Sequence, residues 1–144
     1  MPQATYTATV DRPMDAVFGY LADGEKCAEW RPGVVDIKHV SGTGVGARYA
    51  QGVKGPMGRR IAADFELTVF EPNTHLEFQT LTGPARPHGR YDLAAVDGGT
   101  RVTFSLDAQL GGIQKLLMGG MVQKTMDAEV HALDNLKQVL ESRP

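Results

Sequence analysis

Three side chains in this sequence suit general acid–base chemistry, in which a group within hydrogen-bonding reach of a substrate moves a proton. They are the imidazole of His39 and the phenols of Tyr49 and Tyr91. His39 shares a predicted strand face with Val35 and Ile37, so it is the first candidate for a base that faces the interior. A histidine satisfied in the core or at its rim is the commoner arrangement. These three residues are therefore catalytic candidates only, and no complete acid–base pair is assigned.

The other reactive side chains show no pattern that would support catalysis or metal binding. His75, His88 and His131 lack the spacing of metal ligands, and Cys27 has no nucleophile signature around it. The glycine-rich stretch at 42–46 lacks the Gly-Lys-Ser/Thr ending of a phosphate-binding loop. We therefore expect no metal and no cofactor.

A stronger pattern comes from aromatic and polar side chains that occupy inward positions on several predicted strands. Buried polar groups need partners, so the tips of Tyr49, Gln51 and Tyr91 bond either to one another and water or to a ligand. The single tryptophan lies either at a cavity mouth or beneath the short helices as a plug, the second arrangement being favoured. The residues expected to contact a ligand from this pattern are Trp30, Tyr49, Gln51, Phe65, Phe78, Tyr91 and Phe104.

Glycine pairs and methionines mark the start of the last predicted helix. The pair Gly119–Gly120 costs about 1 kcal/mol per residue against alanine, which suggests that the helix must bend there or let a ligand approach its backbone. Met118 and Met121 lie beside this pair, and thioether side chains repack easily around apolar ligands. We predict that 111–121 forms an adaptable cavity wall, the alternative being ordinary core packing.

The elements that must position these residues follow from the periodicity of apolar side chains. The order is one strand, two short helical segments, a meander of strands and one long helix, which favours an α+β fold. The predicted strands are 4–10, 34–40, 45–53, 59–70, 75–81, 89–96 and 100–108, with helical segments at 13–24, 25–30 and 113–140. The buried side of the long helix is predicted to hold Leu116, Leu117, Val122, Met126, Val130, Leu133, Leu136 and Leu140.

The sheet that these strands form must be curved. Seven strands at about 4.8 Å spacing make a sheet far wider than one helix of about 10 Å diameter can cover. The sheet therefore curls around the helix, and the short helices close one end. Such an arrangement encloses an interior space, which side chains either fill or leave as a cavity.

Composition excludes several classes of partner. The chain has 144 residues and a net charge of −2, which suits one domain over 1–144 and gives no basic patch for nucleic acid. No apolar run approaches the roughly 20 residues of a membrane span, so we expect no stable membrane insertion. The start of the chain has no signal-peptide pattern, and Cys27 stands alone. We expect a cytoplasmic protein, monomeric or homodimeric.

Several short motifs, taken in order, resemble one superfamily. They are DRPMDAVFGYLAD at 11–23, WRPG at 30–33, GTGVG at 42–46 and DGGTRVTF at 97–104, followed by a C-terminal helix. The chain is similar to the START-like helix-grip (SRPBCC) superfamily, in its polyketide cyclase/dehydrase-like branch. The resemblance implies a seven-stranded curved antiparallel sheet that grips the C-terminal helix around an apolar cavity, with two short helices after the first strand. Members bind lipids, sterols, polyketides, hormones or quinones, and no fixed catalytic set is shared among them.

Two functions fit these expectations. The first is a binding or carrier protein for a small hydrophobic molecule, such as a lipid, polyketide, sterol or quinone. The second is a polyketide cyclase, aromatase or dehydratase that uses the same cavity. The absence of a convincing acid–base pair, nucleophile or metal site favours the first. A protein-interaction module would require an exposed apolar patch, which the sequence does not locate.

Overall fold

The computed structural model describes residues 2–83 and 85–143, and the side chains of residues 56, 113–116 and 118 lie outside the described part. The chain runs from a strand through short helices and a meander of strands to two C-terminal helices. In order, the elements are β1 (Gln3–Val10), α1 (Met14–Ala22), η1 (Gly24–Lys26), α2 (Cys27–Trp30), β2 (Val34–Ser41), β3 (Arg48–Lys54), η2 (Pro56–Gly58), β4 (Arg60–Ala62), β5 (Phe65–Glu71), β6 (His75–Thr80), β7 (His88–Val96), β8 (Gly99–Asp107), α3 (Gly112–His131) and α4 (Leu133–Glu141). The α+β class is confirmed.

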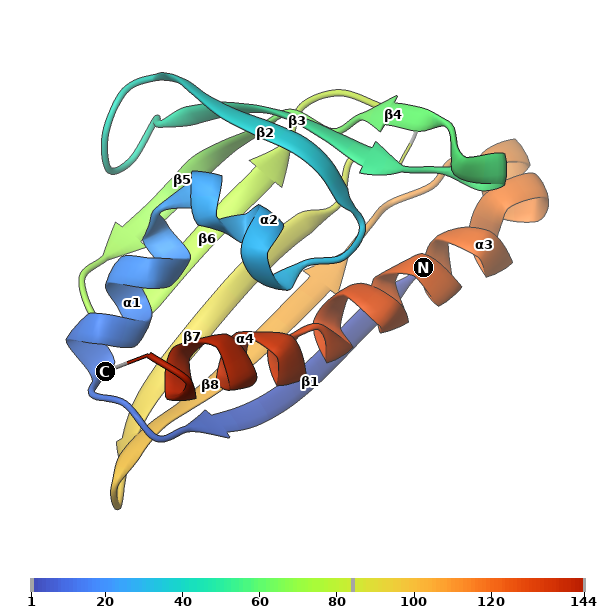
Figure 1. The fold of residues 1–144 in the computed structure, drawn as a ribbon. Coiled ribbons are helices and arrows are strands. Elements are labelled where there is room, and N and C mark those ends of the chain that lie inside the picture. Colours follow the sequence, from blue (N-terminus) through green and yellow to red (C-terminus); the bar gives the residue numbers. More distant parts are fainter. Residues whose placement is uncertain (1, 84, 144) are drawn as a thin grey trace.

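The described strands form one antiparallel sheet. Its order is β1-β8-β7-β6-β5-β3-β2, and the short β4 pairs with β3 beside this path. Figure 1 shows that the sheet is curved and that α1, α2, α3 and α4 gather on its concave side. The predicted helix-grip fold, with seven strands around a long C-terminal helix, is confirmed.

The strand predicted over 59–70 is divided in two. β4 and β5 both pair with β3 in one register, Gly52 opposite Ala62 and Tyr49 opposite Phe65, but the ladder is interrupted between them. At the interruption the Gln51 N–H donates to a carboxylate oxygen of Asp64 over 3.0 Å. A side chain therefore accepts this N–H where strand pairing would use a backbone carbonyl.

The C-terminal stretch, predicted as one helix, is divided into two helices. The break separates α3 from α4 at Ala132, whose N–H donates to the Glu129 carbonyl over 3.0 Å, a three-residue bond that tightens the last turn. Gly120 lies inside the unbroken α3, and a Cβ added there would meet no atom within 4 Å. Close packing therefore does not explain this glycine.

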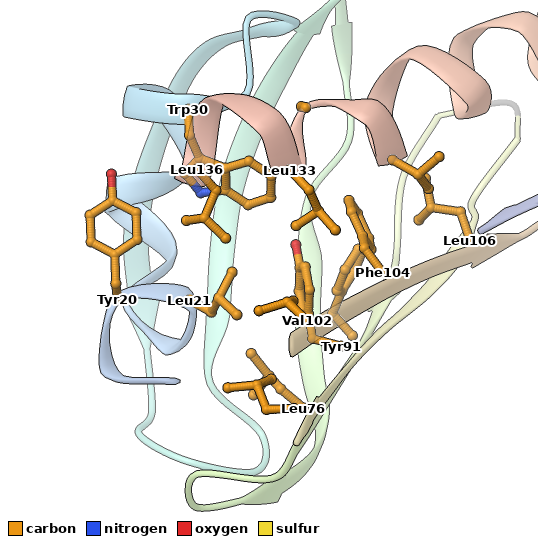
Figure 2. Packing of buried hydrophobic residues seen from close by; sticks show 14 of the residues in the cluster. Tyr20, Leu21, Trp30, Leu76, Tyr91, Val102, Phe104, Leu106, Leu133 and Leu136 are labelled. Carbon is orange, nitrogen blue, oxygen red and sulfur yellow. The ribbon is translucent and has the colours of Figure 1, made fainter. Parts of the chain in front are cut away.

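The core lies between the concave face and the helices. In α1, Val17, Phe18 and Leu21 are buried at helical spacing, as predicted, after Pro13 at the N-cap. Figure 2 shows Leu133 and Leu136 of α4 reaching toward side chains of the sheet. The labelled residues in this part of the core are Tyr20, Leu21, Trp30, Leu76, Tyr91, Val102, Phe104, Leu106, Leu133 and Leu136.

The two halves of α3 differ in burial. Val122, Met126 and Val130 in its second half are buried. In its first half Leu117 is 74% exposed, so its predicted place on the buried side was wrong. The apolar spacing continues beyond the part of the helix that the sheet covers, and Leu116 lies outside the described side chains.

Candidate functional site

A small cavity lies between residues 21–31 and strands β5–β7. Its volume is about 10 Å³, close to what one water molecule requires. Among its lining residues are Leu21, Cys27 and Arg31 from the helical side and Phe65, Phe78 and Tyr91 from the sheet. We predicted an apolar space under the C-terminal helix, but no described side chain of α3 or α4 lines this cavity. The segment from α1 to α2 covers it instead.

A row of aromatic rings crosses the concave face beside the cavity. Tyr49 stacks on Phe65 with ring centroids 5.1 Å apart, and Tyr91 stacks on Phe104 at 4.5 Å. Phe78 joins the two pairs, at 5.5 Å from Phe65 and 6.1 Å from Tyr91. The structure therefore brings the five sequence-predicted aromatic residues of the strands into one continuous wall.

Glycine at position 89 makes room for this wall. Gly89 faces inward on β7, and a Cβ there would lie 2.2 Å from Cζ of Phe78. No side chain fits at that distance, so the Phe78 ring lies directly over the bare backbone. The sequence gives no hint of this role, because the glycine neighbours the loop at 81–87 and could equally end a turn.

Trp30 is buried behind the cavity. Its ring lies edge-on to Tyr91 at 6.4 Å and to Phe104 at 6.2 Å, and it is only 2% exposed. Figure 2 shows it beside Leu133 and Leu136 of α4. Among the described residues, its indole Nε1 is the one fully buried side-chain nitrogen or oxygen without a hydrogen-bond partner. This position matches the plug arrangement and leaves one donor unused.

A buried polar group borders the same space. Arg31 Nε donates to Glu129 Oε2 of α3 over 2.7 Å, and Arg31 Nη1 donates to Gln51 Oε1 over 3.0 Å. Gln51 Nε2 in turn donates to the Ala63 carbonyl over 3.1 Å. We name Arg31, Glu129 and Gln51 the interior polar group. Gln51 therefore finds its partners in Arg31 and the Ala63 carbonyl, whereas the sequence offered only Tyr49, Tyr91 and water, or a ligand.

Arg31 and Glu129 were not among the predicted site residues. Burial alone would lower the pKa of Arg31, but the Glu129 carboxylate more than offsets burial, and the pKa of the guanidinium lies above its ordinary value. Arg31 therefore stays charged. One signal was present in the sequence: Glu129 lies three residues after Met126 and next to Val130, inside the apolar stripe of the helix. A carboxylate there requires a buried partner.

Two further ionisable side chains line the cavity without charge. Burial raises the pKa of the Tyr91 phenol well above its usual value, and burial likewise raises the pKa of the Cys27 thiol. Both side chains are neutral near pH 7. No described residue hydrogen-bonds the Tyr91 hydroxyl, and Figure 2 shows it pointing from the sheet toward the helices.

The remaining acid–base candidates lie toward one edge of the sheet. Tyr49 is buried over Gly24, and desolvation raises the pKa of its phenol. His39 is exposed on β2, and its Nε2 lies 2.6 Å from the Gly42 carbonyl oxygen. Its ring is 5.1 Å from that of Tyr49, but His39 does not line the cavity. A bulge between Val34 and Asp36 precedes it and changes the face that Val35 takes, which the alternation could not anticipate.

The methionines predicted to contact a ligand are placed differently. Met121 is 54% exposed on α3 and does not line the cavity. The side chain of Met118 lies outside the described residues. The role of 111–121 as a cavity wall stays a prediction, and the described part of that stretch contributes no lining residue.

The outer face of the sheet carries a second polar cluster. His75 lies 2.5 Å from Glu77, and His88 lies 2.7 Å from the other oxygen of the same carboxylate. The outward-facing Asp92 and Asp107 approach the second nitrogens of these rings at 2.5 and 3.4 Å. We name these five residues the outer histidine row. The hydrogen bond to Glu77 raises the pKa of His75, and the same bond lowers the pKa of Glu77.

A broad surface cleft lies beside this row. Its volume is about 560 Å³, and its lining includes Gln79, Arg86, His88, Asp107 and Gln109. The lining is polar and of mixed charge, and nothing in it matches an apolar ligand. Among the described residues no group of three His, Cys, Asp or Glu side chains could hold a metal ion. No helix of the described chain is long and apolar enough to cross a membrane.

Comparisons with known proteins agree with this architecture. TTHA0849 from Thermus thermophilus is 22% identical, with a TM-score of 0.83 over 99% of this chain and 100% of that one. A START superfamily protein from Mycobacterium smegmatis is 14% identical, with a TM-score of 0.71 over 97% of each chain. The Zhui aromatase/cyclase from Streptomyces sp. R1128 is 15% identical, with a TM-score of 0.68 over 95% of this chain and 94% of that one. No curated protein sequence matches.

The family follows from a sequence match over almost the whole chain. The family model described as "Polyketide cyclase / dehydrase and lipid transport" matches residues 1–141. The similar structures share the fold at identities too low to carry more than the fold. The resemblance that the sequence motifs indicated is confirmed. The chain belongs to the polyketide cyclase/dehydrase and lipid transport family, and it shares the helix-grip fold of the START superfamily protein.

Proposed function

We propose that this protein binds a small hydrophobic molecule, such as a lipid, polyketide, sterol or quinone, as a carrier or sensor. The binding site is the space between residues 21–31 and strands β5–β7. One observation carries the proposal: an aromatic wall meets a void at the point where Arg31 and Tyr91 also face it. Apolar lining with a few convergent polar groups is the usual composition of a small-molecule site.

Binding requires the cavity to widen, because it now has room for about one water molecule. The covering segment is suited to move. η1 and α2 are three and four residues long and have no side-chain cap, and helices this short have little stability of their own. The end of α2 is held by the Arg31–Glu129 pair and by Asn135 Nδ2, which donates to the Trp30 carbonyl over 3.1 Å. We propose that this segment opens as a lid.

The test is a titration of ¹⁵N-labelled protein with isopropylbenzene, an uncharged apolar probe, followed by amide NMR. Saturable shifts are expected in residues 21–31 and in β5–β7. Ala22→Leu fills part of the lined space and should weaken binding about tenfold, the scale of 1.4 kcal/mol. Ala128→Leu, on the exposed side of α3, is the matched control and should bind as the unchanged protein does. Absence of saturable binding would refute the proposal.

A cyclase, aromatase or dehydratase is the second candidate. The observation in its favour is that Tyr91 and Arg31, which both face the cavity, could together polarise a substrate carbonyl. His39 gives this candidate no support from its exposed position. Incubation with a poly-β-ketone thioester, followed by mass spectrometry, distinguishes the two. Conversion to a product lighter by one water, faster than in buffer and lost in Tyr91→Phe, would favour the enzyme.

A further inference from the structure

The tip of the β3–β4 hairpin holds the most exposed of the large apolar side chains described. Met57 is 99% exposed, against 54–74% for the others in that group. Its backbone lies in the left-handed region at φ 59°, which glycine adopts freely and which a side chain with a Cβ makes unfavourable. A glycine would avoid both the exposure and the strain, as Gly58 beside it does at φ 77°. Folding of the chain alone therefore gives no reason for a methionine at this position.

Positive charge is concentrated at the same tip. Lys54 and Arg60 are direct partners in the pairing of β3 with β4, and like charges opposite one another destabilise a strand pair. Arg60 is balanced by Asp36, whose carboxylate accepts two hydrogen bonds from it at 2.8 Å. Lys54 and Arg59 are exposed, and neither forms an ion pair with any described residue. Two cations therefore stand near Met57 without a described counterion.

The charge of the chain, −2 in total, is unevenly distributed along the sequence. Residues 50–63, from the middle of β3 through β4, contain three Lys or Arg and no Asp or Glu. Residues 108–126, which include the first half of α3, contain two Lys and again no Asp or Glu. Figure 1 shows η2 and the first half of α3 at the same end of the molecule, opposite the end that holds α1. These two segments therefore bring positive charge to one end.

Apolar side chains are exposed on both of these segments. Leu117 and Met121 of α3 are 74% and 54% exposed, and their spacing of four residues puts them on one face of the helix. Together with Met57 they give apolar contacts from two separate elements. A protein partner would need a matching pocket for each contact, whereas a lipid surface accepts apolar side chains anywhere in its plane. Exposed apolar side chains accompanied by Lys and Arg are typical of surfaces that bind anionic membranes.

We propose that this end of the protein docks on a membrane that contains anionic lipids. The Met57 side chain enters the boundary between headgroups and acyl chains, and Lys54 and Arg59 contact lipid phosphates. The contact is adsorption at the lipid surface and requires no spanning helix. None of these three residues lines the cavity under residues 21–31, so the proposal does not depend on the proposed function.

Co-sedimentation with lipid vesicles tests the proposal. Vesicles of equal parts phosphatidylglycerol and phosphatidylcholine should bind the protein about tenfold or more tightly than vesicles of phosphatidylcholine alone, because each Lys or Arg at an anionic surface contributes about fivefold. Raising the ionic strength from about 0.1 M to about 1 M should remove most of the binding, since the Debye length falls from about 10 Å to about 3 Å.

Two matched pairs of variants locate the docking surface. Met57→Ser should weaken vesicle binding about tenfold through lost apolar burial. Val45→Ser removes an exposed apolar side chain from the β2–β3 connection, at the other end of the molecule in Figure 1, and should leave binding unchanged. Arg59→Gln should weaken binding about fivefold. Arg101→Gln removes an exposed cation from β8 and should not.

Methyl NMR of the unchanged protein gives a readout that attraction between charges alone does not produce. The protein carries ¹³C-methyl methionine, and a small amount of anionic vesicles contains a spin-labelled lipid. The Met57 and Met121 methyl resonances should broaden most, because these side chains meet the lipid. The methyl resonance of Met126, which is 3% exposed, should broaden least.

The outcomes are independent of the cavity experiments. Absence of binding to the anionic vesicles would overturn the proposal, leave the cavity function standing and point to a protein partner for Met57. Equal binding to neutral and anionic vesicles would overturn the role of Lys54 and Arg59. Equal losses in Met57→Ser and Val45→Ser, or equal broadening of the methionine methyl resonances, would overturn the assignment of the surface.

Discussion

The polar side chains of this protein gather in two places that differ in their access to solvent. The interior polar group places Arg31 and Glu129 at 2.7 Å with side-chain exposures of 8% and 17%. The outer histidine row places Glu77, 21% exposed, between His75 at 18% and His88 at 33% on the outer face of the sheet, with Asp92 and Asp107 at 45% and 59%. The contact geometry is alike, and the surroundings are not.

The comparison shows that the interior charges need a reason other than stability. The outer row keeps more contact with water than the interior pair does, so its ion pairs cost less to form and contribute little to stability. The interior pair lost its hydration on folding. Apolar residues of equal volume in place of such a pair commonly give a fold that is equally stable or more stable. A binding role for Arg31 and its neighbours supplies a reason that folding does not.

The largest difference is expected when one member of the interior pair is removed. Arg31→Met leaves Glu129 buried without its cation and should lower the free energy of unfolding by about 3–5 kcal/mol. The control is Arg60→Met, which breaks a surface pair with Asp36 at about the same distance and should cost under about 1 kcal/mol. Urea denaturation measures both. Similar losses in the two variants would mean that burial does not separate the groups.

A second contrast compares the inner and outer faces of one strand. Gly89→Ala places a Cβ against the Phe78 ring and should cost about 1–3 kcal/mol through overpacking of the aromatic wall. Its neighbour Arg90 points outward, and Arg90→Ala should change stability by less than about 0.5 kcal/mol. If Gly89→Ala proves as harmless as Arg90→Ala, the wall packs more loosely than its ring contacts imply. Thermal unfolding of the two variants measures the difference in stability.

A third substitution tests whether the glycines of α3 contribute to ligand binding in the cavity. A Cβ at Gly120 meets open space, so Gly120→Ala should raise stability by about 1 kcal/mol through helix propensity. Binding of isopropylbenzene should not change, because the described part of 111–121 lines no cavity. Weaker binding in Gly120→Ala would restore this stretch as a wall of the site.

The smallest expected effect is a pH dependence of the outer histidine row. The pKa of His75 is raised from 6.5, so its contribution to stability is full below that pH and is lost as pH rises through the folded-state pKa. The pKa of Glu77 is lowered from 4.5, so its contribution is present above that pH and is lost as pH falls.

The row should therefore stabilise the fold most between about pH 4.5 and 6.5. His75→Gln should flatten the profile by less than about 1 kcal/mol. Chemical denaturation at a series of pH values is the measurement. A profile unchanged by the substitution would show that the row contributes nothing measurable. Arg31, whose pKa lies above its ordinary value, stays charged throughout this range.

Periodicity predicted the aromatic wall because strand alternation decides which face a side chain takes. Tyr49, Phe65, Phe78, Tyr91 and Phe104 each have an apolar neighbour two residues away on the same strand. The curved sheet followed from the mismatch between its width and one helix. These are local or geometric arguments, and they held.

The partners across the interior could not be predicted in the same way. Arg31 and Glu129 are 98 residues apart, and their contact depends on how α2 and the residue after it pack against the C-terminal helices. We expected the cavity under the long helix, but it lies under residues 21–31. This position also depends on how distant segments pack together. Apolar spacing also failed at Leu117, because α3 continues past the sheet edge that covers its second half.

The central claim is that a ligand enters beneath the segment from α1 to α2 and not beneath the first half of α3. Amide hydrogen exchange with and without saturating isopropylbenzene tests it most directly. Without ligand, protection should be weak at Gly112–Met121 and strong at Leu133–Leu140, since low local packing favours opening. With ligand, protection should rise in residues 24–31 and around Phe65, Phe78 and Tyr91. A rise confined to 112–121, or no rise anywhere, would contradict this claim.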